Sequence, residues 1–337
     1  MIHVGVDLHQ RFCYMTALDA RGRQLNAQAV PNQAEALRGY FRQFRGRVQV
    51  AVEACGFWPA FREAVEGEVE RLRLVHPQRV KAIASAKLKN DRVDSATLAH
   101  LLRCDLLPEA WMADAATREL RQQVRLRASL VRQGTRLKNQ VHAILHQHGL
   151  RSPVSDLFGK AGRGWLAQAP LPGMARQAVE VYCAVLDDLR THIAAQDRAL
   201  RQRAREDKRV PLLMTVPGIG MYSAVLLLAE LGDIRRFPDK EAVCSYAGLV
   251  PWVRESGDKG KRGSITRAGS RWLRWILVEA ACTAERTSPA VQRWMRGRGR
   301  GKHPHVVRVA VARKLLVAVW AMLRDDVGFE ESIFAAE

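Results

Sequence analysis

The chain has 337 residues, of which 47% are hydrophobic and 26% charged, and its 54 Lys and Arg against 34 Asp and Glu give a net charge of +20. This length predicts two or three domains, and no apolar run approaches the roughly 18 residues that would span a bilayer. Membrane proteins are therefore excluded, and the positive charge predicts binding to polyanions such as nucleic acids.

The N-terminal sequence and the cysteines indicate where the protein works. MIHVGVDLHQ lacks the basic segment and apolar core of a secretory signal, so we expect a cytoplasmic protein. The six cysteines form no CxxC pair and no Cys/His cluster of zinc spacing, which predicts reduced cysteines. The two histidines of HQH at 146–148 do not share a helix face, so no zinc site is expected there.

The first hundred residues predict a mixed α/β sheet. The segments IHVGVDL and FCYMTALDARGRQLNAQAV alternate apolar and polar residues, and the second breaks at Ala20-Arg21-Gly22, so together they predict a meander of three strands. Strands and helices then alternate, as in a sheet with crossover connections. Their expected ranges are helix 33–44, strand 47–55, helix 58–66, strand 71–77 and helix 91–103.

The middle of the chain predicts a pair of long helices. Apolar residues form one stripe along the helix expected over 115–150, and the other faces of that helix are rich in arginine. A second helix is expected over 175–205. Between them, RSPVSDLFGKAGRG is expected to be a loop. The pair then forms an antiparallel hairpin, which could serve as a coiled-coil surface for a dimer.

The last third predicts a mostly helical domain. VPGIG, with Gly218 and Gly220, is a tight turn before an apolar helix, as in a helix-hairpin-helix motif whose backbone N–H groups approach a phosphate. A compact turn between two packed helices explains the same residues. Further helices are expected over 268–285 and 304–323, separated by the basic loop RGRGRGKHPH. The predicted domains are 1–110, 111–208 and 209–337.

Most of the positive charge lies in this last part. Residues 250–324 contain 17 Lys and Arg and 4 Asp and Glu, which is +13 of the total +20. This region begins with PWVRESGDKGKRGSITRAG, at 251–269, which holds four glycines and seven charged side chains. By composition alone the stretch is typical of a solvated linker. Its position in the most basic part of the chain also allows a nucleic-acid site.

Four carboxylates in the first hundred residues form a candidate metal site. Asp7 ends the first predicted strand, and Glu53 lies in an apolar strand, where an unpaired carboxylate costs several kcal/mol to desolvate. Asp91 and Asp94 lie at i and i+3 and so share a helix face. Alternatively, Asp7 caps a turn, Asp91 is an N-cap and Asp94 favours the helix dipole. As a set, the four acids suit a site for two Mg²⁺ ions, which take oxygen ligands.

The order of these features resembles a known family. Asp7 on a strand, a hairpin, Glu53 on a strand and Asp91-x-x-Asp94 on a helix resemble the RuvC-like branch of the RNase H fold. With VPGIG, YAGLVP, RESG and GSITRAGSRWLRWIL, nearly the whole chain resembles the bridge-RNA-guided insertion-sequence transposases and recombinases. These bacterial proteins join a RuvC-like domain to a C-terminal serine domain. The departures are His9-Gln10, where many members carry a lysine, and Cys55, where Thr or Ser is usual.

The resemblance implies a mechanism and a set of partners. Asp7, Glu53, Asp91 and Asp94 would bind Mg²⁺, with Mn²⁺ as a substitute, and Ser256 would attack DNA to form a 5′-phosphoserine. The partners would be double-stranded target and donor DNA and a guide (bridge) RNA, and a dimer would assemble to a tetramer at the bacterial nucleoid. Charge and glycine content predict a nucleic-acid surface at Gly218, Gly220, Arg254, Lys259, Lys261, Arg262 and Arg267.

Two other functions remain open from the residues. In a RuvC-like endonuclease, metal-activated water would attack DNA and Ser256 would be incidental. In an architectural nucleic-acid binder, the helix-hairpin-helix and basic loops would suffice, and neither Asp7 nor Glu53 would be needed. The segment RESGDKGKRGS, at 254–264, is expected to become ordered only when nucleic acid and the carboxylates come together.

Overall fold

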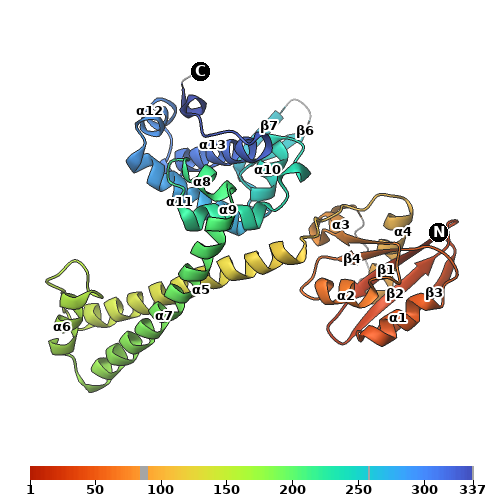
Figure 1. The fold of residues 1–337 in the computed structure, drawn as a ribbon, viewed down its shortest axis with the longest axis horizontal. Helices are drawn as coiled ribbons and strands as arrows, with labels where there is room; N and C mark the ends of the chain where they lie inside the picture. Colours follow the sequence, from red (N-terminus) through yellow and green to blue (C-terminus); the bar gives the residue numbers. More distant parts are fainter. Residues whose placement is uncertain (84–89, 257–258, 336–337) are drawn as a thin grey trace. The chain divides into compact units, whose positions relative to one another are not determined.

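The computed structural model describes residues 1–83, 90–256 and 259–335, without the side chains of 253–262. The chain divides into two compact units, Met1–Met112 and Ala113–Glu337. The predicted arrangement of a mixed α/β sheet followed by helices is confirmed (Figure 1). The second unit contains both the long helices and the C-terminal helices, so the boundary predicted at 208/209 falls inside it. No described helix is long and apolar enough to cross a membrane.

The first unit is built on a five-stranded sheet with the order β3-β2-β1-β4-β5. The expected meander is antiparallel, and β1, β4 and β5 are parallel to one another. The strands are β1 (Ile2–Leu8), β2 (Phe12–Leu18), β3 (Gln24–Pro31), β4 (Val48–Glu53) and β5 (Arg71–Val75). Since parallel strands need crossover connections, helices cover the sheet and the carboxyl ends of β1 and β4 meet at one edge.

Helices pack on both faces of this sheet. Apolar side chains of α1 (Ala34–Arg42) and α2 (Trp58–Val65) share a core with alternate residues of β1 and β4, such as Val6 and Val52. On the other face, α3 (Pro77–Ile83) and α4 (Asp91–Arg103) contribute to a second cluster with Ala51. The sequence pattern does not predict α3, because its seven residues carry too little helical periodicity to be distinguished from the end of β5.

The position of α4 depends on one glycine in β1. A Cβ atom on Gly5 would lie 2.0 Å from the carbonyl oxygen of Ser95 and 2.4 Å from the amide nitrogen of Ala99, both in α4. Thr16 lies on the neighbouring strand β2. Its hydroxyl forms a fully buried hydrogen bond of 2.8 Å with the hydroxyl of Ser95 in α4. The helix backbone therefore rests directly on the sheet, at a spacing that only glycine allows.

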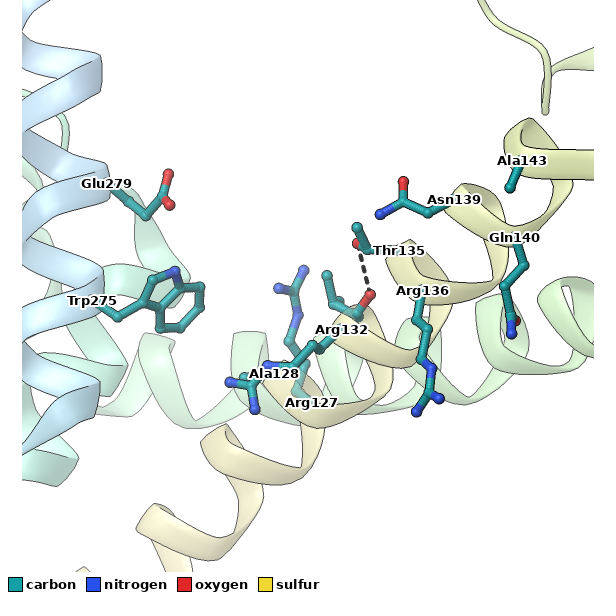
Figure 2. Close-up of a pocket in the computed structure, with 11 residues that line it drawn as sticks. Arg127, Ala128, Arg132, Thr135, Arg136, Asn139, Gln140, Ala143, Trp275 and Glu279 are labelled. Carbon is teal, nitrogen blue, oxygen red and sulfur yellow. Dashed lines mark hydrogen bonds between the residues drawn. The ribbon is translucent and has the colours of Figure 1, made fainter. Parts of the chain in front are cut away.

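The second unit contains the expected helical hairpin, with α5 (Ala115–Gln147) packed along α7 (Gly173–Glu206). The connection expected to be a loop contains a helix, α6 (Lys160–Gln168), because Leu166 and neighbouring apolar residues pack into the end of the hairpin. Another face of α5 lines a groove with α11 (Arg271–Thr287), which Figure 2 shows.

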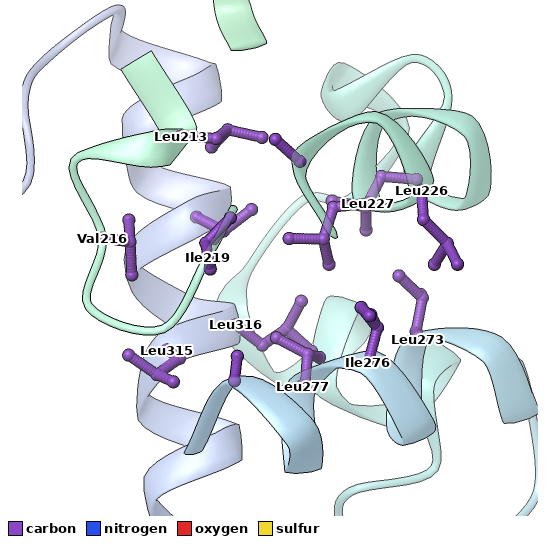
Figure 3. Packing of buried hydrophobic residues seen from close by; sticks show 14 of the residues in the cluster. Leu213, Val216, Ile219, Leu226, Leu227, Leu273, Ile276, Leu277, Leu315 and Leu316 are labelled. Carbon is purple, nitrogen blue, oxygen red and sulfur yellow. The ribbon is translucent and has the colours of Figure 1, made fainter. Parts of the chain in front are cut away.

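Further helices pack around α11 in the rest of this unit. They are α8 (Arg209–Met214), α9 (Met221–Leu231), α10 (Lys240–Ala247), α12 (Pro289–Arg298) and α13 (Pro304–Asp325), with two 3₁₀ turns at Ile234–Arg236 and Glu331–Phe334. Figure 3 shows their core, in which Leu227 of α9, Leu277 of α11 and Leu316 of α13 converge. The basic loop expected at 296–305 is partly helical, because α12 begins at Pro289 after the N-cap Ser288 and continues to Arg298.

A buried acid joins α5 to this core. Glu230 in α9 is 1% exposed and accepts two hydrogen bonds from the Arg125 guanidinium, at 2.8 and 3.0 Å. Ser270, the N-cap of α11, donates its hydroxyl to the same carboxylate at 2.9 Å. Arg121 donates to the carbonyl oxygens of Ala229 and Glu230, each at 2.8 Å. This network fixes α5 against α9 and the start of α11.

The stretch 251–269 is not a linker without secondary structure. It forms two antiparallel strands, β6 (Pro251–Ser256) and β7 (Lys259–Ile265). Gly263 provides space for Trp252, because a Cβ at Gly263 would lie 2.9 Å from the indole ring. After β7 the chain turns at Gly269, which has φ +115° and faces the carbonyl oxygen of Tyr246. Three of the glycines that suggested a linker, 260, 263 and 269, therefore belong to a hairpin and the turn that follows it.

Replacing Gly5 by alanine should displace α4. The added methyl group would overlap backbone atoms, and overpacking of this kind costs about 1–3 kcal/mol or more of unfolding free energy. Gly39→Ala in α1 is the matched control, since nothing lies within 4 Å of that site and alanine favours a helix by roughly 0.5–1 kcal/mol. Chemical denaturation would compare them. Equal stability of the two variants would contradict the close packing at Gly5.

Candidate metal centre

Two of the candidate acids end neighbouring parallel strands. Val6 of β1 pairs with Val52 of β4, so Asp7 and Glu53 occupy the next position on each strand. Laterally adjacent residues point to the same face of a sheet, and adjacent strands lie about 4.8 Å apart. Asp7 shares its face with Gly5, the residue against which α4 packs. The register therefore places both carboxylates beneath the start of α4.

The other two acids begin α4. Asn90 is the N-cap, and its side chain accepts a hydrogen bond of 2.9 Å from the Val93 amide. The alternative that Asp91 is the N-cap is therefore wrong, because Asn90 already satisfies the free amide. Asp91 and Asp94 lie in the first turn, where the positive end of the helix dipole stabilises carboxylates. Neither is needed to cap the helix, which leaves both carboxylates able to bind a cation.

A histidine that the sequence analysis treated only as a departure from the family joins this group. His9 Nε2 lies 3.3 Å from Asp7 Oδ2 and 3.4 Å from Asp91 Oδ2. Ligand atoms of the three side chains all lie within 4.8 Å of one another. The signal for His9 was its position two residues beyond an acid at a strand end, but a single histidine in a turn is too common to identify a ligand.

The electrostatics of Asp7 fit a cation site. Burial raises the pKa of Asp7, the carboxylates of Asp91 and Asp94 raise it further, and His9 partly opposes the shift by charge and hydrogen bonding. In the protein alone, the surroundings of Asp7 therefore disfavour the ionised form of its carboxylate. His9 Nε2 is itself buried and makes no hydrogen bond of good geometry, although two carboxylate oxygens lie nearby. Oxygen ligands around such a point suit a divalent cation such as Mg²⁺ or Mn²⁺.

The structure brings the four predicted acids to one edge of the first unit, although to different degrees. The ligand atoms of Asp7 and Asp91 are close together, and Asp94 is close enough to affect the pKa of Asp7. Glu53 is placed by strand register at the same edge. Among the described ligand atoms, those of Asp7, His9 and Asp91 thus form one compact candidate position for a cation.

Ser256 is the last residue of β6, and its backbone pairs with Lys259 at the start of β7. Strand pairing also sets Arg254 opposite Lys261, and Val253 opposite Arg262. The side chains of Arg254, Ser256, Lys259, Lys261 and Arg262 lie outside the described residues, as does Gly257. The backbone places these residues towards the end of the hairpin at which β6 connects to β7, and their assigned roles stay predictions.

The remaining predicted nucleic-acid residues lie at turns. Gly218 has φ +83°, and a Cβ there would lie 2.1 Å from the carbonyl oxygen of Ala280 in α11. The compact-turn explanation therefore accounts for Gly218. Gly220 is the exposed N-cap of α9 with open space around it. Arg267 is exposed in the left-handed turn after β7, with φ +54°. Both are accessible to a ligand.

Comparison with known proteins covers both units of the chain. A family model described as "Transposase IS116/IS110/IS902 family" matches residues 210–296, and the DEDD_Tnp_IS110 model, described as "Transposase", matches residues 4–149. The second match includes all four candidate acids and His9. The first includes Ser256 and the hairpin.

Similar proteins come from several bacteria. The "Probable family 20 transposase" of Pseudomonas aeruginosa is 28% identical over 96% of this chain and 97% of its own length. The "Transposase for insertion sequence element IS1328" of Yersinia enterocolitica is 27% identical over 84% of this chain and 85% of its own. The "Pilin gene-inverting protein" of Moraxella bovis is 34% identical over 37% of this chain and 40% of its own. With transposase models matching both units and relatives spanning nearly the whole chain, this protein belongs to the IS116/IS110/IS902 family of insertion-sequence transposases.

Proposed function

We propose that this transposase cuts and rejoins DNA with two groups, a cation site formed by Asp7, Glu53, Asp91 and Asp94 and a serine nucleophile, Ser256. The observation that carries the proposal is the gathering of acids and His9 at the carboxyl ends of β1 and β4. A DEDD-type transposase domain suggests divalent metal use, which the chemistry of these side chains supports. In this proposal the first unit is a RuvC-like domain.

The proposed reaction conserves the energy of the DNA backbone. The Ser256 hydroxyl attacks a phosphodiester, its oxygen–phosphorus bond forms, and the bond from phosphorus to the 3′ oxygen breaks. The serine proton is lost and the departing 3′ oxygen gains a proton, leaving a 5′-phosphoserine and a free 3′-hydroxyl. A 3′-hydroxyl from another strand then reverses the step and releases Ser256. Bound divalent cations would stabilise charge on the attacking and leaving oxygens.

Side chains of this chain prepare the reaction. A serine hydroxyl is a weak nucleophile without a neighbouring base, metal or positioned phosphate. The basic residues assigned around Ser256, Arg254, Lys259, Lys261 and Arg262, would hold the phosphate near it. Gly220 and Arg267 would bind neighbouring phosphates, Gly220 as part of a helix-hairpin-helix-like turn. The relative named for pilin gene inversion supports chemistry that rejoins DNA strands.

The proposal includes partners implied by the family resemblance. A guide (bridge) RNA would select target and donor DNA by base pairing, while the protein binds mainly backbones. The net charge of +20 supports contact with both nucleic acids at the bacterial nucleoid. The α5–α7 hairpin would form the dimer surface, and dimers would assemble to a tetramer that brings acids and serine together on DNA.

Loss of the Ser256 hydroxyl should abolish a covalent protein–DNA intermediate. Wild-type protein and Ser256→Ala would be incubated with guide RNA, DNA carrying a nick that traps the intermediate, and Mg²⁺. Denaturing electrophoresis and mass spectrometry then detect the adduct. Ser264→Ala, in β7 of the same hairpin, is the matched control and should form the adduct as wild type does.

An adduct formed by Ser256→Ala would refute the role of this serine. Cleavage by wild-type protein without any adduct would instead favour a RuvC-like endonuclease that uses activated water. Strand exchange that continues in Asp7→Asn, or with excess chelator, would exclude the metal role and favour an architectural binder.

Asp7→Asn should uncouple stability from divalent cations. Mg²⁺ or Mn²⁺ at about 100 times its dissociation constant should stabilise the wild type by about 2.7 kcal/mol, because it binds only the folded state. The variant should lose this gain. Glu66→Gln, an exposed acid at the end of α2, is the control and should retain it. Melting curves with chelator and with each cation measure the effect, and an unchanged response in Asp7→Asn would contradict the site.

When a chelator is present, wild type and Asp7→Asn should also differ in how their stability depends on pH. The folded pKa of Asp7 lies above its ordinary value of 3.8, so folding disfavours the ionised carboxylate. Above that raised pKa, wild type should therefore be less stable than Asp7→Asn. The gap should shrink as pH falls through the raised pKa towards 3.8, since the folded state then takes up the proton. A gap that widens on acidification would contradict the environment described for Asp7.

A further inference from the structure

The groove between α5 and α11 lies within the second unit and has a volume of about 760 Å³. Arg132, Thr135, Arg136 and Asn139 of α5 contribute to one wall, and Trp275 and Glu279 of α11 form the other. Figure 2 shows Trp275 and Glu279 facing α5 across the opening. The groove contains none of the acids, the serine or the basic residues assigned to the proposed reaction.

Two arginines that line the groove form no ion pair with a described acid, although Glu279 lies on the opposite wall. Along α5, Arg125 is paired with Glu230 and Arg127 with Asp197. Arg132 and Arg136 are exposed, and neither forms an ion pair with any residue that the structure describes. Two guanidinium groups one helical turn apart therefore face solvent with their donors free for a ligand. The fork of donors on a guanidinium group matches the oxygens of a phosphate and can bind two of them at once.

An aromatic ring is held at the same place. Trp275 is 38% exposed, which is high for tryptophan in a folded domain, and lines the groove. Its neighbour Trp272 is 8% exposed, and the two rings meet edge to face with centroids 6.1 Å apart. The Arg132 guanidinium lies 5.4 Å from the centroid of Trp272. Trp272 is thus held by packing and supports Trp275. The exposed ring of Trp275 is left as a stacking surface in the groove that Arg132 and Arg136 also line.

We propose that this groove binds single-stranded nucleic acid. Arg132 and Arg136 contact successive phosphates, and Trp275 stacks on one unpaired base, a combination typical of single-strand binding. Asn139 and Glu279 supply the donors and acceptors that base edges and sugars require. A base within a duplex has both faces covered by its neighbours, so the aromatic surface favours unpaired strands. The strand is an unpaired segment of RNA or a separated strand of DNA.

The test measures binding without chemistry. Full-length protein carrying Asp7→Asn, in chelator, is titrated into labelled oligo(U), oligo(dT) or a DNA duplex, each of about 12 nucleotides or base pairs, within the site sizes of single-strand binders. Fluorescence anisotropy is recorded over a range of salt concentrations. Because neither the cation site nor Ser256 takes part, failure here is independent of failure of the proposed transposition mechanism.

Trp275→Ala should weaken single-strand binding on the order of tenfold, and Trp275→Phe should retain most of it, because a phenyl ring also stacks. Duplex binding should not change. Arg132→Gln and Arg136→Gln should each reduce the log–log salt slope for single strands by about 0.7. Arg198→Gln on α7 is the matched control, since Arg198 is exposed and forms no ion pair with a described residue.

A larger loss for oligo(U) would identify RNA as the strand, a larger loss for oligo(dT) would identify separated DNA, and an equal loss would show that the groove binds unpaired strands of both kinds. The proposal is overturned if Trp275→Ala binds single strands as its parent does, or if duplex loses as much affinity as single strands. It is also overturned if Arg198→Gln lowers the salt slope as much as Arg136→Gln. Melting temperatures of the variants verify folding, and the exposed Arg136 gives an independent test if Trp275→Ala is unstable.

Discussion

The contact between α4 and β1 at Gly5 is the constraint on which the candidate metal centre depends. Because a Cβ at this position would lie 2.0 Å from a helix carbonyl, the absence of a side chain lets the helix reach the sheet. The Thr16–Ser95 hydrogen bond then fixes the helix against sliding. One consequence is unfavourable, since Asp91 and Asp94 are brought close enough to Asp7 to raise its pKa. A fold that holds like charges together in this way would gain stability from binding a cation, so the proposed metal affinity depends on this packing.

A second buried contact has the same role in the other unit. Glu230 is almost fully buried, and an isolated carboxylate there would be strongly destabilising. Arg125 and Ser270 satisfy it from α5 and from the start of α11. The two helices that line the groove are therefore joined through one charge. Their relative position is set by hydrogen bonds of fixed direction, which a purely apolar contact would not provide.

The sequence predicted the sheet well because alternation is a local signal, and β1 to β5 appear where it placed them. The acids were also predictable, since Glu53 in an apolar strand and the Asp91-x-x-Asp94 spacing are both unusual. His9 was not identified, because its closeness to Asp91 depends on how α4 packs on the sheet. The hairpin at 251–265 was not predicted as strands, since its glycines resemble those of a linker. Glycines such as Gly263 serve packing there, and that role depends on the position of Trp252.

Ion pairing distinguishes arginines that hold the fold together from arginines that are available to bind a ligand. A net charge of +20 predicts that the protein attracts polyanions, but it does not predict where they bind. In the second unit, Arg125, Arg127 and Arg308 are held by Glu230, Asp197 and Glu285. These arginines have already exchanged water for a carboxylate, so a phosphate would have to displace that partner. Arg132 and Arg136 have no such partner among the described residues, and their interaction with phosphate has no competing ion pair to break. Local pairing therefore identifies which arginines are available to a phosphate, which the density of basic residues does not.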